Sequence, residues 1–110
     1  MSSWETQMRK GVVELAVLAS IAGGETYGYR IVEHLRKVEG LEFTESTVYP
    51  VLTRLARDGS LAIREESSPS GPTRRYYRLT EGGQARLSAM SASWRKVSRS
   101  LDTLLEGAPS

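Results

Sequence analysis

The segment from residue 46 to residue 57 carries hydroxyl and guanidinium groups on the positions that a helix would turn outward. The groups belong to Ser46, Thr47, Tyr49, Thr53, Arg54 and Arg57, and Pro50 lies on the same outward face. An ordinary solvated face mixes Glu and Lys, whereas hydroxyl and guanidinium groups donate hydrogen bonds to phosphates and to base edges. The pattern indicates a surface that binds nucleic acid. The alternative is a polar helix face that contacts nothing.

A second group of such donors lies further along the chain. Arg74 and Arg75 follow the polar segment 67–73, in which Ser70, Gly71 and Thr73 can bring backbone N–H groups close to a phosphate. Arg64 and Arg78 are expected to widen the same positive surface. Paired arginines are also common on hairpins that bind no DNA, so this segment alone leaves both interpretations open.

Charge in this chain is concentrated rather than large. The 110 residues include 15 Lys and Arg against 13 Asp and Glu, a formal net charge of +2. Six arginines lie between Arg54 and Arg78, against three acidic residues in the same stretch. Twelve of the 15 basic residues are arginine, the type suited to bidentate contacts with phosphates and guanine edges.

The rest of the composition argues against other classes of protein. The length fits one domain, and the lack of cysteine excludes disulfides and thiolate zinc sites. The one histidine, His34, has no second ligand at metal spacing. The sequence contains no serine elbow, no glycine-rich phosphate loop and no carboxylate pair in an apolar segment. We therefore expect no catalytic activity, no metal and no cofactor.

The longest apolar run, 12–22, is too short to span a membrane and contains Glu14. It follows Arg9 and Lys10 and ends in small residues, as a secretory signal does. Cleavage there would remove the most hydrophobic segment of a small domain. We therefore expect an unprocessed, cytoplasmic chain with no membrane partner.

Apolar residues at helical spacing predict three short helices in the first half of the chain. The first covers residues 8–22, and the second runs from a cap at Thr26 to Gly40, with Gly28 marking a close approach of two helices. The first seven and the last five residues carry no pattern and are expected to fray.

The third helix is the one that carries the outward donors. Ser46 is its expected N-cap, because Pro50 is tolerated only near a first turn, and Asp58 closes it. Its expected buried face consists of Val48, Val51, Leu52 and Leu55.

Two strands, Leu61–Glu66 and Arg74–Leu79, are expected to form a hairpin with a seven-residue tip. Thr80 then caps a last helix over 81–105. Apolar residues on this helix alternate three and four apart, the spacing of a coiled-coil dimer seam. The seam consists of Leu87, Met90, Trp94, Val97, Leu101 and Leu104.

This order predicts a mainly α fold with a small β-hairpin, the winged variant of the helix-turn-helix. Residues 1–80 would form the DNA-binding domain, and residues 81–105 would form a C-terminal dimerisation helix within the same compact unit. The partners would be double-stranded DNA and a second copy of the chain. The alternative is a winged helix that binds only other proteins.

The sequence resembles the PadR-type winged-helix transcriptional regulators over most of its length. The resemblance rests on 8–11 (MRKG), 27–29 (YGY), 47–52 (TVYPVL) with 54–55 (RL), and 71–80 (GPTRRYYRLT). It implies a homodimer that binds an inverted repeat, usually as a repressor, through the third helix and the wing. The single last helix is similar to that of the compact subfamily, in which this helix forms the dimer.

The resemblance also implies roles for particular residues. It puts Ser46, Thr47 and Tyr49 at the DNA end of the third helix and Arg74 and Arg75 on the wing. For the tyrosines near the second helix, we expect Tyr27 to pack in the core and Tyr29 to reach a phosphate, although plain packing would explain either ring. Alternation would send one ring of the Tyr76-Tyr77 pair to the core and the other outward.

Trp94 occupies a seam position that is also tryptophan in some compact relatives, where paired indoles line a pore for flat aromatic compounds. This suggests a planar aromatic effector at Trp94. The alternative is that Trp94 only fills the dimer core. Trp4 either joins that interface or is disordered.

Overall fold

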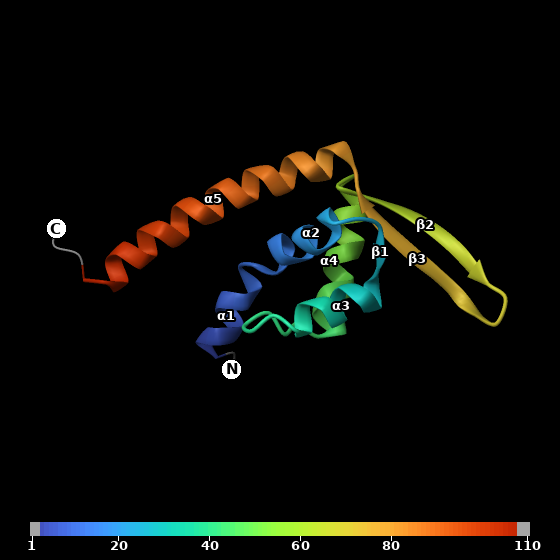
Figure 1. The fold of residues 1–110 in the computed structure, drawn as a ribbon, viewed down its shortest axis with the longest axis horizontal. Coiled ribbons are helices and arrows are strands. Elements are labelled where there is room, and N and C mark those ends of the chain that lie inside the picture. The colour runs from blue at the N-terminus through green and yellow to red at the C-terminus, as the bar shows by residue number, and fades with distance from the viewer. Residues whose placement is uncertain (1–2, 108–110) are drawn as a thin grey trace.

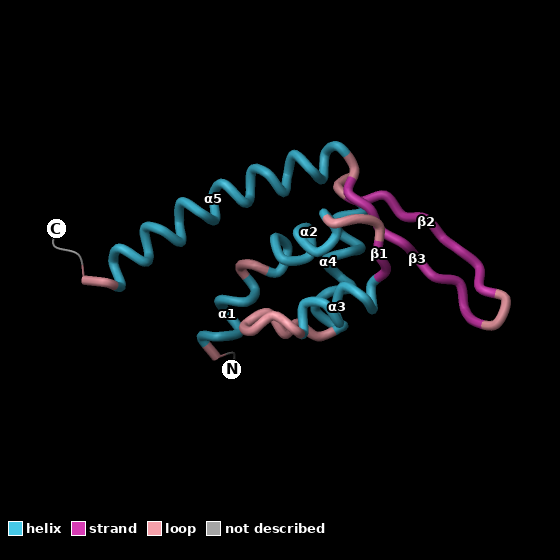
Figure 2. The backbone as a smooth tube through the Cα atoms, in the orientation of Figure 1, coloured by secondary structure: helices cyan, strands magenta, loops and turns pink. Residues whose placement is uncertain are grey.

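The computed structural model describes residues 3–107 and confirms the mainly α, winged helix-turn-helix fold. Figures 1 and 2 show helices packed beside a hairpin, with one long helix leading away. The elements are α1 (Trp4–Lys10), α2 (Val13–Ala22), β1 (Thr26–Tyr27), α3 (Gly28–Arg36), α4 (Glu45–Arg57), β2 (Leu61–Ser68), β3 (Gly71–Leu79) and α5 (Glu81–Leu105).

The core lies where α2, α3 and α4 meet. Its largest fully buried side chains include Leu18 and Ile21 of α2, Ile31 of α3, and Leu52 and Leu55 of α4. The predicted apolar face of α4 is buried in full. Leu61 of β2 and Tyr77 of β3 are buried in the same core, which therefore also fixes the outward face of α4 relative to the hairpin.

The sheet has three antiparallel strands in the order β1-β3-β2, one more than predicted. Thr26 is not a helix cap: it pairs with Tyr77, and Tyr27 is the N-cap of α3. The hairpin tip is Pro69-Ser70, so the predicted seven-residue tip is wrong. The strand pairing continues from Glu66 to Ser68, where the side chains are polar and exposed. Strands pair through their backbones, so the pairing does not need the apolar side chains by which the strands were predicted.

The predicted first helix is two helices. The N–H of Gly11 bonds to the carbonyl of Met8 and closes α1, and Val12 leaves helical geometry before α2 begins. Ser3 caps α1 by accepting from the N–H of Thr6, so fraying is wrong for residues 4–7. The other residues expected to fray include 1–2 and 108–110, which lie outside the described part.

Two predicted helix ends differ from those observed. Thr44, not Ser46, precedes α4, so Pro50 lies beyond the first turn and removes one interior backbone bond. Helix α3 ends at Arg36, four residues before Gly40. The bounds of α5 and its Thr80 cap are as predicted.

Helix α5 makes the molecule elongated. The radius of gyration is 16.1 Å, against about 13 Å expected for a compact domain of this length. Leu87 and Met90 pack partly against the protein's own core. Trp94, Leu101 and Leu104 are 45%, 48% and 75% exposed, so the far half of the seam is uncovered in the single chain.

No helix within residues 3–107 is long and apolar enough to cross a membrane.

Candidate nucleic-acid interface

An open groove of about 420 Å³ lies where the start of α3, the outward face of α4 and strand β3 meet. It brings together five of the predicted DNA-binding residues, namely Tyr29, Tyr49, Thr53, Arg74 and Arg75. The rest of its lining is Tyr27, Gly28, Thr73 and Tyr77. The lining therefore offers hydroxyl and guanidinium donors and includes no carboxylate.

Three other predicted residues lie outside the lining, in the first half of α4. Ser46 and Pro50 are exposed, and Thr47 is half-buried. The hydroxyl of Thr44 lies 3.0 Å from that of Ser46 and 3.2 Å from that of Thr47. These contacts gather three hydroxyl groups at the beginning of the helix.

Tyr49 lies directly over Gly28. A Cβ atom on Gly28 would be 2.5 Å from Cε1 of Tyr49, so any side chain there would displace the ring. The predicted close approach at Gly28 is confirmed. Burial, followed by the charge of Glu45, raises the pKa of the Tyr49 hydroxyl, which therefore remains protonated and able to donate at neutral pH.

The outer side of the sheet carries a short row of aromatic rings. Tyr77 is buried and Tyr76 half-buried, as the alternation predicts. The Tyr76 ring meets that of Tyr27 edge to face, with centroids 5.6 Å apart, and the Arg64 guanidinium lies 4.7 Å from the Tyr76 centroid. Tyr27, which we expected in the core, is half-buried and lines the groove.

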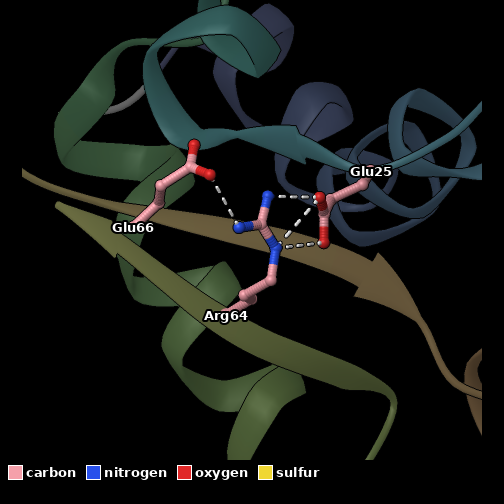
Figure 3. Close-up of polar contacts among 3 residues, drawn as sticks. All are labelled: Glu25, Arg64 and Glu66. Carbon is pink, nitrogen blue, oxygen red and sulfur yellow. Dashed lines mark hydrogen bonds and ion pairs between the residues drawn. The ribbon is translucent and has the colours of Figure 1, made fainter. Parts of the chain in front are cut away.

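Arg64 does not widen the positive surface as expected. Its guanidinium donates to both carboxylate oxygens of Glu25, with the shortest bond at 2.7 Å, and to Glu66 at 3.2 Å (Figure 3). These hydrogen bonds raise the pKa of Arg64, and the bond to Arg64 lowers that of Glu25. Two carboxylates thus neutralise a guanidinium that the sequence pattern had suggested was free.

Arg54, which the sequence predicts to contact DNA, forms an ion pair within the protein. Its guanidinium donates to Glu14 of α2 at 2.7 Å, and Arg86 of α5 donates to the other oxygen of the same carboxylate. Glu14 thus ties α4 to α5 through α2. A side chain long enough to reach a neighbouring helix need not follow the helix face from which it starts.

Arg57 lies at the opposite end of α4 from Ser46, about 16 Å along the axis. It is exposed and does not line the groove. His34 is also exposed, and within residues 3–107 no three acidic, histidine or cysteine side chains gather as a metal site would require.

A helix pair followed by a winged hairpin, with a donor-lined groove between them, defines the winged helix-turn-helix class. The chain belongs to the transcriptional regulator PadR-like family, whose model matches residues 17–89.

Similar proteins extend this assignment. A PadR-like transcriptional regulator from Bacillus cereus is 34% identical, with a TM-score of 0.79 over 90% of this chain and 96% of that one. A transcriptional regulator of Mycobacterium tuberculosis is 33% identical over 81 residues, 74% of each chain. The structure of Bacillus subtilis PadR in complex with operator DNA is 26% identical, with a TM-score of 0.65 over 72% of this chain and 46% of that one.

Proposed function

We propose that the protein is a sequence-specific DNA-binding regulator that acts as a repressor and binds an inverted-repeat operator as a homodimer. The observation that carries the proposal is the groove, where α3, α4 and the wing present donors without a carboxylate in the lining. In this arrangement α4 enters the major groove and the wing follows the backbone. The operator complex of the Bacillus subtilis relative supports the same role.

The dimer would form through α5. An apolar hollow of about 630 Å³ lies between α1, α2 and α5 and is lined by Trp4, Met8, Leu41, Trp94 and Leu101, among others. A second copy of α5 would cover this hollow and the exposed seam residues. Two-fold symmetry would then place two α4 helices on half-sites about one helical turn, or roughly 34 Å, apart.

Selection from a random duplex library tests the DNA-binding proposal. We expect an inverted repeat, and we expect Tyr49→Phe, which keeps the ring over Gly28, to change the selected sequence. Arg75→Ala should weaken binding to all duplexes alike, because a phosphate contact carries no sequence information. It should also reduce the salt slope, the slope of log binding constant against log salt concentration, by about one per subunit. Arg99→Ala, which removes the same charge from α5, is the matched control.

Fluorescence anisotropy of labelled duplexes gives both affinity and slope. If the wild-type protein bound no duplex at low salt, the DNA-binding proposal would fail and a module that binds only proteins would replace it. If Arg75→Ala changed sequence preference but not the slope, the division of roles would be wrong.

We also propose that a planar aromatic effector binds between the two Trp94 side chains of the dimer. Trp94 borders the hollow just described and a second apolar hollow of about 550 Å³ that also contacts Met90 and Val97. A tryptophan in a seam holds helices apart, which leaves room for a flat ring. An effector that favours one spacing of the α4 helices would change operator affinity.

Tryptophan fluorescence tests the effector proposal. In a Trp4→Phe background only Trp94 reports, and we expect micromolar proflavine to quench it in the absence of DNA. Adding Trp94→Leu to that background should abolish dye binding, measured by the dye's own anisotropy. When release of the operator by the dye is measured, the same variant serves as the control, because any release that it still shows comes from intercalation of the dye into the duplex. Equal dye binding by Trp94→Leu would contradict the effector proposal and would mean that Trp94 only fills the dimer core.

A further inference from the structure

Two guanidinium groups from different elements lie against the ring of Tyr27. Arg74 of β3 has its Cζ atom 4.6 Å from the ring centroid, and Arg30 of α3 has its own 5.7 Å away. Both side chains are exposed, and neither forms an ion pair within residues 3–107. Arg30 is not among the residues that the sequence predicted to bind DNA.

Two other arginines of the wing have acidic partners. Arg64 is held by Glu25 and Glu66, and Arg75 lies 3.8 Å from Glu65. Attraction to an aromatic face holds a guanidinium in place without neutralising it. Arg30 and Arg74 therefore keep their full positive charge.

Tyr27 is itself a fixed platform. Its backbone pairs with Tyr76 in the sheet, its ring meets the Tyr76 ring edge to face, and the next residue begins α3. Tyr27 and Arg74 both line the donor groove. The two cations consequently border the surface on which DNA would lie, one from the helix-turn-helix and one from the wing.

We propose that Arg30 and Arg74, both positioned by Tyr27, clamp the DNA backbone at the junction of α3 and the wing. This inference rests on the proposed DNA-binding function and names phosphate contacts for it. Guanidinium groups match phosphate oxygens in bidentate geometry, so each of the two arginines would bind a phosphate of its own. The clamp fixes the position of the protein on the duplex and reads no bases.

The test compares Arg30→Ala, Arg74→Ala and the double variant on a duplex of random sequence across a salt series. Each neutralised phosphate contributes about 0.9 to the slope, so each single variant should lose about one per subunit and the double variant about two. This corresponds to roughly a tenfold loss of affinity per subunit contact at 0.1 M salt. Arg36→Ala, at the exposed far end of α3, is the matched control and should bind as wild type.

Variants of Tyr27 test whether its ring is needed to position the two arginines. Tyr27→Phe keeps the ring and should keep the wild-type slope, whereas Tyr27→Leu should lower it, with circular dichroism checking that the fold is intact. A wild-type slope in Arg30→Ala, or an equal loss in Arg36→Ala, would overturn the clamp while leaving DNA binding in place. Failure of the wild-type protein to bind any duplex would instead overturn the proposed function.

Discussion

The Leu101→Glu variant is expected to be monomeric and to bind the selected inverted repeat on the order of 100-fold more weakly, because the two half-sites are no longer engaged together. Leu101 lies in the exposed half of the seam and borders the apolar hollow beside Trp4 and Trp94. A second α5 covering that hollow would bury the new carboxylate without a partner, which costs several kcal/mol. A dimer of small subunits cannot absorb this cost.

Sedimentation velocity measures the predicted change directly. Ala92→Glu adds the same charge on the opposite side of α5, at an exposed position, and should remain dimeric. The Leu101→Glu monomer should still bind a single half-site, with about half the salt slope of the dimer. A dimer of unchanged stability would contradict the proposed interface, whereas dissociation of both variants would indicate a nonspecific charge effect.

Local signals in the sequence predict most of the helices correctly. The apolar spacing of α4 and the Thr80 cap of α5 need only residues a few positions apart, and both are observed. The close approach at Gly28 is also predictable from local signals, because a glycine at the start of a helix with apolar periodicity indicates that another helix packs closely there. The break at Gly11 was not predicted, because the apolar spacing continues across it.

Features that depend on distant partners could not be predicted in this way. The strand β1 exists because Thr26 and Tyr27 pair with β3, about 50 residues later. The ion pairs of Arg54 with Glu14 and of Arg64 with Glu25 join residues 40 and 39 positions apart. Composition therefore shows that arginines are concentrated in this region, but only the fold separates those bound to carboxylates from those that remain available.

Gly83→Ala is expected to destabilise the folded chain, in contrast to the substitutions of exposed arginines. Gly83 is buried in the first turn of α5, and a Cβ atom there would overlap the carbonyl oxygen of Ser60 and lie 3.0 Å from its carbon. Backbone cannot move aside as a side-chain tip can. The same Ser60 oxygen accepts from the N–H of Thr80 at 3.1 Å, so displacing it disturbs the junction between the α4–β2 turn and α5.

The Thr80 hydroxyl connects the parts of this junction. Its oxygen accepts from the N–H of Gly83 at 3.0 Å and lies 2.6 Å from the carbonyl oxygen of Gly59, to which it donates. Overpacking typically costs about 1–3 kcal/mol and loss of an N-cap about 1 kcal/mol more. Alanine's better helix propensity returns about 1 kcal/mol, so we expect a net loss of about 1–3 kcal/mol.

Gly82→Ala makes the experiment specific. Its Cβ would lie 3.7 Å from the Thr80 hydroxyl oxygen and 3.8 Å from the Gly59 carbonyl, both ordinary contacts, so helix propensity should leave this variant at or slightly above wild-type stability. Urea unfolding at one fixed protein concentration compares the two, because the stability of a dimer depends on concentration. Equal midpoints for Gly82→Ala and Gly83→Ala would mean that the Ser60 carbonyl can move aside, and that this contact does not hold α5 to the α4–β2 turn.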